Sequence, residues 1–98
     1  MASFYATAIK MKNDCFFSDN LLEIDKIFLA SNGWYPKETI YDYLIQNPSD
    51  IKVKNEFGPV LIACKSINGE KYVKSSPNET KSDNLLSLER YWTKIYKK

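Results

Sequence analysis

Residues that could do chemistry are common in this chain, but none occurs at a spacing that specifies a reaction. Aspartate, glutamate, lysine, tyrosine and serine are available as acids, bases or nucleophiles, yet no nucleophile is placed with a base. The chain has no histidine, which removes the usual general base at neutral pH and the commonest metal ligand. Its glycines, Gly33, Gly58 and Gly69, are too scattered to form a phosphate-binding loop. We therefore predict that the protein is not an enzyme.

The two cysteines indicate neither a metal centre nor a redox centre. Cys15 and Cys64 stand alone, without the C-x-x-C spacing of zinc sites and dithiol motifs. Cys64 lies inside an apolar run and is expected to act as a small buried hydrophobe. A disulfide between the two cysteines remains open. We expect no metal and no cofactor.

The chain ends in a basic and aromatic segment. Its candidate binding residues are Arg90, Tyr91, Trp92, Lys94, Tyr96 and Lys97. Such a set could stack nucleobases and neutralise phosphates. The alternative is structural, because Leu88, Trp92 and Ile95 form a helical stripe that would dock on the core and leave the cations in solvent. Periodicity favours docking, although a docked helix could still present charge on its other side.

Two shorter pairs are also candidate binding residues. Trp34 and Tyr35 would make a strong contact point for a protein partner if they are exposed, but such a tryptophan more often covers the core. Asp83 and Asn84 could bind a ligand from a loop. We favour the alternative that one of them caps or turns the backbone, while the leucines that follow anchor the loop.

The first half of the chain predicts two strands and the best helix. Residues 3–11 alternate as a strand. Residues 23–30 fit a strand or a helix, and their β-branched and aromatic content favours a strand that pairs with the first. A helix is expected to open at Trp34–Glu38, with Pro36 in its first turn, and to end at Asn47–Pro48.

The second half predicts three strands, at residues 50–54, 60–64 and 71–74, followed by a helix. The middle strand is apolar on both faces and should be central. Asn68–Gly69 is typical of a type I′ hairpin, with positive φ at both residues. Residues 81–98 predict a loop and an amphipathic helix. The expected fold is α+β, with a small, mostly antiparallel sheet in β-β-α-β-β-β order, one packed helix and this C-terminal helix.

Length and charge give weaker indications. Ninety-eight residues predict one domain, 1–98. Residues 1–50 carry four lysines against seven acidic residues, whereas residues 51–98 carry nine lysines and Arg90 against five acidic residues, which permits a basic face. The N-terminus lacks the pattern of a secretion signal, and no apolar run approaches the roughly 20 residues that span a bilayer. We expect a cytoplasmic protein without membrane contact.

The stretch Gly69–Leu88 resembles a small bacterial family of unknown function, the domain-of-unknown-function family numbered three-eight-nine-two. Its members look like G-x-K-Y-L-[RK]-T, then a turn, a Thr or Ser, and D-N-L-x-x-L-P. The matching residues here are Gly69, Lys71, Tyr72, Val73, Lys74, Thr80, Asp83, Asn84, Leu85 and Leu88. Glu89 stands where the family usually places proline, and the basic aromatic segment departs from its pattern. The resemblance implies an α+β fold and supplies no activity.

These observations together predict a small binding module. Its expected partner is a protein, or a second copy of the chain, with an accessory or inhibitor role in a bacterium or in a mobile element such as a phage. The alternative function is nucleic-acid or nucleotide binding through the basic second half.

Overall fold

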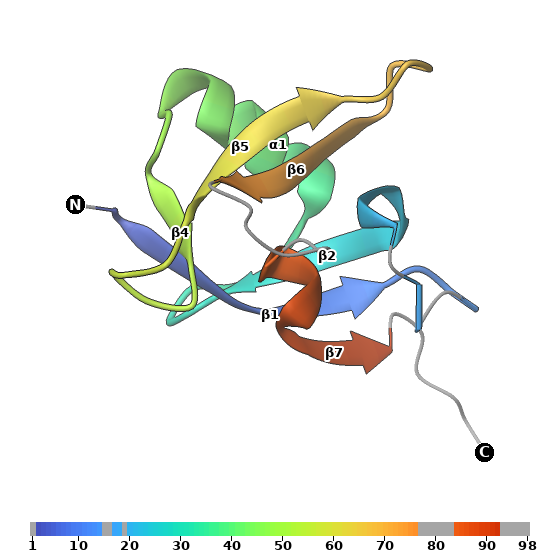
Figure 1. The fold of residues 1–98 in the computed structure, drawn as a ribbon, viewed down its shortest axis with the longest axis horizontal. Coiled ribbons are helices and arrows are strands. Elements are labelled where there is room, and N and C mark those ends of the chain that lie inside the picture. Colours follow the sequence, from blue (N-terminus) through green and yellow to red (C-terminus); the bar gives the residue numbers. More distant parts are fainter. Residues whose placement is uncertain (1, 15–16, 19, 77–83, 93–98) are drawn as a thin grey trace.

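A computed structural model describes residues 2–14, 17–18, 20–76 and 84–92. These residues form a small α+β domain that contains one α-helix (Figure 1). The strands are β1 (Phe4–Met11), β2 (Ile24–Leu29), β3 (Gly33–Pro36), β4 (Ile51–Val53), β5 (Val60–Lys65), β6 (Lys71–Ser76) and β7 (Glu89–Trp92). The helices are α1 (Lys37–Gln46) and two 3-10 turns, η1 (Leu21–Glu23) and η2 (Asn84–Ser87).

The strands form one mixed sheet in the order β3-β2-β1-β4-β5-β6, with β7 also paired to β1. Most pairings are antiparallel, but β4 and β7 both run parallel to β1. β4 pairs with Phe4–Ala6 and β7 pairs with Ala8–Met11. β2 occupies one edge of β1, and β4 and β7 share the opposite edge. The sheet therefore divides along the edge that β4 and β7 share. In Figure 1, β5 and β6 lie above β1 and β2, and β7 continues the lower part.

A bulge in β1 marks the point where the sheet divides. Ala6 faces Leu29 and Ala8 faces Phe28, so Thr7 is an extra residue in β1. The bulge changes which side chains point inward: Ala6 is buried before it, and Ile9 and Met11 are buried after it. An uninterrupted alternation, as predicted for residues 3–11, would have placed Ala6 and Ile9 on opposite faces.

The core fills the space that the bent sheet and the helices enclose. α1 packs against β5 and β6 on one side and against β2 and β3 on another, and Ile40 and Leu44 are its buried apolar side chains. η2 contacts β6 and β1 and contributes Leu85 and Leu86, and Leu88 follows it. The core residues are Ala6, Ile9, Met11, Ile24, Ile27, Leu29, Ile40, Leu44, Ile51, Val53, Leu61, Val73, Leu85, Leu86 and Leu88.

The α+β class and the strand at residues 23–30 are confirmed, but the predicted order of strands is wrong. Trp34 and Tyr35 do not open the helix; they belong to β3, which pairs antiparallel with β2. The short turn at residues 30–32, just before Gly33, lets the chain fold back on β2 before the helix begins. Pro36 is therefore the residue that precedes α1, and its lack of an N–H costs nothing there.

The predicted C-terminal amphipathic helix is also wrong over its described part. Glu89–Trp92 forms β7, and η2 supplies only one turn of 3-10 helix before it. The physical reason is the open edge of β1 beyond Thr7, whose backbone groups are paired by β7. Residues 93–98, the rest of the predicted helix, lie outside the described residues.

The hairpin at Asn68–Gly69 is present, but it is not a type I′ turn. Gly69 has φ of +86°, and Asn68 is absent from the positive-φ residues. The N–H of Gly69 donates to the Ser66 carbonyl and that of Ser66 donates to the Glu70 carbonyl, both at 2.9 Å. This is the three-residue loop that ends in a left-handed glycine.

Among the described residues, no helix has the length and apolar content needed to cross a membrane.

Candidate functional site

β3 directs its two aromatic residues to opposite sides of the sheet. Successive side chains of a strand point to opposite faces. Trp34 therefore lies on the outer face, which points away from the core, and Tyr35 packs against the core on the inner side. The neighbouring pair predicted from the sequence thus contributes to two separate sites.

The outer face carries a cluster of three aromatic rings and one lysine, which we call the aromatic patch: Lys10, Phe28, Trp34 and Tyr91. The ring centroids of Phe28 and Trp34 are 5.2 Å apart, and those of Trp34 and Tyr91 are 5.4 Å apart, both in edge-to-face geometry. The ammonium of Lys10 lies 4.6 Å from the Trp34 ring centroid, within the range of a cation–π contact. The patch joins residues from both ends of the chain.

The Trp34 side chain reaches Tyr91 by lying across two intervening strands. β3 and β7 are separated by β2 and β1, and neighbouring strands are about 4.8 Å apart. Ala8 occupies the position between them, opposite Phe28. Its methyl side chain leaves room for the large ring, and Ala8 is buried although it points to the outer face. A larger residue at this position would separate the two rings.

The patch remains accessible and keeps an uncharged tyrosine. Tyr91 is 43% exposed. The pKa of Tyr91 is raised, chiefly because its side chain is hydrogen-bonded to Glu89, so its hydroxyl stays protonated at neutral pH. Lys26 lies opposite Lys10 on the neighbouring strand and adds a second cation to the same face.

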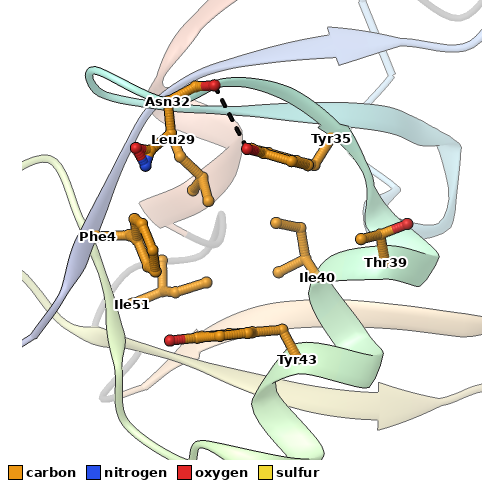
Figure 2. Close-up of a pocket in the computed structure, with 8 residues that line it drawn as sticks. All are labelled: Phe4, Leu29, Asn32, Tyr35, Thr39, Ile40, Tyr43 and Ile51. Carbon is orange, nitrogen blue, oxygen red and sulfur yellow. Dashed lines mark hydrogen bonds between the residues drawn. The ribbon is translucent and has the colours of Figure 1, made fainter.

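The inner side holds a half-open apolar cavity of about 170 Å³ (Figure 2). It lies between α1, β3 and the start of β1, and its lining residues are Phe4, Leu29, Asn32, Tyr35, Thr39, Ile40, Tyr43 and Ile51. Cavities for drug-sized ligands are roughly 300–1,000 Å³, whereas an apolar cavity of about 150 Å³ holds a benzene molecule. The cavity therefore has room for one small apolar group.

The tyrosine hydroxyls around this cavity are already engaged. Tyr43 donates to the carboxylate of Asp50, which also accepts from the N–H of Ser3 at 3.1 Å. This contact lowers the pKa of Asp50 and raises that of Tyr43. Figure 2 shows the Tyr35 hydroxyl directed at the backbone carbonyl of Asn32, at 3.4 Å. Both hydroxyls are thus directed to other protein groups, and the cavity presents a mostly apolar lining.

An ion network with one buried member, Lys37, links α1, the residue after β1 and the β5–β6 hairpin. Lys37 is only 1% exposed, and its ammonium lies 3.1 Å from the Glu70 carboxylate and 3.3 Å from that of Glu38. Lys12 also contacts Glu70, at 3.1 Å. Lysine is almost never fully buried without such partners. The hydrogen bonds from Lys12 and then Lys37 lower the pKa of Glu70, and the bond to Glu70 raises the pKa of Lys12.

This network predicts that the free energy of unfolding decreases at acid pH. Because the pKa of Glu70 is lowered from 4.5, its contribution is present above pH 4.5 and is lost as the pH falls through the folded-state pKa. Glu70→Gln should therefore lower the free energy of unfolding at pH 7 and have a smaller effect at pH 3. Urea denaturation at both pH values measures this difference. Glu56→Gln, at an exposed loop residue, is the control, and an equal effect of Glu70→Gln at both pH values would contradict the prediction.

The structure brings together only part of the predicted binding set. Trp34 and Tyr91 meet in the aromatic patch, and Tyr35 packs against the cavity. Arg90 points elsewhere: its guanidinium donates to the carbonyls of Leu86, at 3.0 Å, and Ser18, at 2.9 Å, so it holds backbone in place. The backbone of Asn84 begins η2 and that of Trp92 ends β7 opposite Met11. Asp83, Lys94, Tyr96 and Lys97 lie outside the described residues, as does Cys15.

Sequence reasoning missed Lys10 and Phe28 as members of the patch. The alternation of β2 could have identified Phe28, because Phe28 and the buried Ile27 lie on opposite faces of that strand. For Lys10 no such signal exists, because the bulge at Thr7 shifts the alternation of β1. Cys64 was expected to be buried, but it is only partly so, as a free thiol.

The fold and the site together define a small α+β domain with an accessible aromatic surface. Within the residues that the structure describes, no three histidine, cysteine or acidic side chains are grouped to hold a metal ion. The chain belongs to the family described as protein of unknown function (DUF3892), whose model matches residues 7–89. No curated protein and no solved structure gives a significant match.

Proposed function

We propose that this protein is a non-enzymatic binding module that contacts a protein partner through the aromatic patch. One observation carries the proposal: Trp34 and Tyr91, which are far apart in the sequence, meet on the outer face of the sheet with ring centroids 5.4 Å apart. Tryptophan and tyrosine are enriched among the residues that dominate binding energy at protein interfaces. A cytoplasmic accessory or inhibitor role in a bacterium or mobile element is the setting that we propose.

The arrangement of the rings supports a protein partner. Trp34 is fixed by Phe28, Tyr91 and Lys10, so its large surface is preorganised and loses little conformational freedom on binding. One face of a ring that holds a cation is less available for stacking with a planar base. A partner would instead pack against the edges of the rings and against the exposed side of Tyr91.

Affinity capture with matched variants tests this proposal. Tyr91→Ala should weaken retention of the partner by about 30-fold, the effect of removing an interface residue worth about 2 kcal/mol. Phe57→Ala removes an equally aromatic side chain that is 95% exposed in a loop, and it should retain the partner. Size-exclusion chromatography reports whether the partner is a second copy. A wild-type protein that remains a monomer without partners, or a Tyr91→Ala variant with unchanged retention, would contradict the proposal.

The second candidate function is binding of single-stranded nucleic acid on the same face. Lys10 and Lys26 lie side by side in the sheet, next to the aromatic rings, and could neutralise phosphates while Tyr91 stacks on a base. Titration with single- and double-stranded oligonucleotides at low and moderate salt distinguishes this function. Electrostatic binding is strongest at low salt, so absence of binding there rules it out.

A further inference from the structure

β5 has one open edge over most of its length. Its pairing with β6 is continuous from Val60 to Lys65, but on its other side the only residue pair with β4 is Lys52 with Val60. No residue in the described ranges pairs with Ala63 or Lys65 on that side. An open strand edge presents unpaired N–H and C=O groups, which are a template for another strand.

The hydrogen-bond pattern identifies the residues that present these groups. Ser66 is hydrogen-bonded to Glu70 at the hairpin end, and the antiparallel register from there to Val60 has no irregularity. Residues of an antiparallel strand direct their backbone groups alternately to its two edges. Ile62 and Cys64 therefore face β6, whereas Ala63 and Lys65 direct their N–H and C=O groups to the open edge.

An apolar groove of about 310 Å³ runs beside this edge. It is lined by the end of α1, the loop that follows it and the start of β5: Leu44, Ile45, Pro48, Ser49, Val60, Leu61, Ile62 and Ala63. Ile45 is 55% exposed and Ile62 is 38% exposed, although both are large and apolar. In Figure 1, α1 and β5 lie next to each other in the upper part of the fold. The groove thus has a strand edge as one wall and a helix as the other.

The far end of the edge carries a cation without a partner in the described chain. Lys65 is exposed and lies directly opposite Lys71 on β6, and like charges in this arrangement repel. Lys71 is neutralised by Asp42 of α1, at 2.8 Å. Lys65 has no such ion pair there. An incoming acidic side chain would give Lys65 the counter-charge that Asp42 gives Lys71.

We propose that an extended peptide segment of a partner protein adds to β5 as a further strand, with an apolar side chain in the groove and an acidic residue at Lys65. The strand edge supplies the backbone hydrogen bonds, and the groove beside it supplies side-chain specificity. Charge complementarity selects this occupant, because neither a purely apolar group nor a basic segment would offset the charge of Lys65. The site is separate from the aromatic patch, so it stands or fails independently of the proposed function.

Amide hydrogen exchange of the free protein gives the first test. The N–H groups of Ala63 and Lys65 should exchange much faster than those of Ile62 and Cys64, which are bonded to β6. If Ala63 and Lys65 are already protected in a dilute monomer, the edge is covered by the chain itself and the proposal is wrong. If they are protected only in a dimer, a second copy is the occupant, and the proposal of a partner peptide is also overturned.

Selection from a random octapeptide library displayed on phage gives the second test. Selected peptides should alternate apolar and polar residues, carry an acidic residue near one end, and slow the exchange of the Ala63 and Lys65 amides. Methylation of alternate backbone nitrogens in a selected peptide should abolish binding, because these groups donate to β5. Lys65→Glu should weaken binding about three- to tenfold, whereas Lys74→Glu, at an exposed lysine of β6, should not.

Two variants test the strand edge and the groove separately. Ala63→Pro removes an N–H that points away from β6, so the β5–β6 ladder is kept while the open edge is blocked. Ile45→Glu alters the groove wall without a backbone change. Both should lose the selected peptides. Selection without any enriched sequence, or enriched peptides that bind Ile45→Glu and the N-methylated form equally well, would overturn the proposal.

Discussion

Replacing Leu85 by alanine is expected to lower the free energy of unfolding by about 2–5 kcal/mol, the range for deleting a buried leucine side chain. Leu85 is fully buried, and its turn, η2, packs against β6 and β1. The surrounding residues belong to different elements and cannot all move inward to fill the space. Since small domains are stable by only about 5–15 kcal/mol, this loss is a large fraction of the total. Urea denaturation measures it.

Ile67→Ala is the matched control for Leu85→Ala. Ile67 is a similar apolar side chain, but it lies exposed in the β5–β6 loop, and its removal should change stability by no more than about 0.5 kcal/mol. A loss below about 1 kcal/mol for Leu85→Ala would mean that η2 does not seal the core. The expected difference between the two variants therefore tests the structural role of the Gly69–Leu88 stretch.

Gly58→Ala is expected to be the second severe change, at about 3 kcal/mol, the upper part of the range for overpacked sites. A Cβ atom at position 58 would lie 1.8 Å from the carbonyl oxygen of Val53 and 2.9 Å from its carbonyl carbon. These are backbone atoms, so no side-chain rotation relieves the contact. The N–H of Val53 donates to the Pro59 carbonyl at 2.8 Å, and this bond closes the β4–β5 turn. Circular dichroism during thermal unfolding would show the loss.

Gly69→Ala separates steric contact from backbone conformation. Gly69 has φ of +86°, but nothing lies within 4 Å of the position of its Cβ atom. An alanine there carries only the cost of the left-handed conformation, about 1–2 kcal/mol. We expect Gly58→Ala to be the more harmful of the two. The reverse order would show that the β4–β5 turn adjusts its backbone more easily than its close contact indicates.

Sequence patterns predicted the elements that are stabilised mainly by residues close to them in the chain. α1 buries Ile40 and Leu44 at helical spacing, and the hairpin forms at Asn68–Gly69. β2 was separable from a helix by its β-branched and aromatic residues. The family was identified from Gly69–Leu88, and its model covers most of the chain.

Elements that depend on distant partners were not predictable in the same way. β7 is a strand because β1 has an open edge, and the helical spacing of Leu88 and Trp92 carries no information about that edge. β3 is similar, since its four residues are held by β2. The bulge at Thr7 moves Lys10 to the outer face, where it meets Trp34. The burial of Lys37 was not predictable either, because its partner Glu70 lies in the β5–β6 hairpin, far from it in the sequence.

The pairing of β7 with β1 determines when the aromatic patch is complete. Trp34 and Phe28 can meet as soon as β2 and β3 form a hairpin, but Tyr91 joins them only after β7 docks beside β1. During synthesis the residues of β7 emerge after all of the other strands described here. A partner that recognises the complete patch would therefore bind the finished fold and ignore nascent or partly unfolded chains. Under the proposed function, the parallel strand pair would thus restrict binding to the completely folded chain.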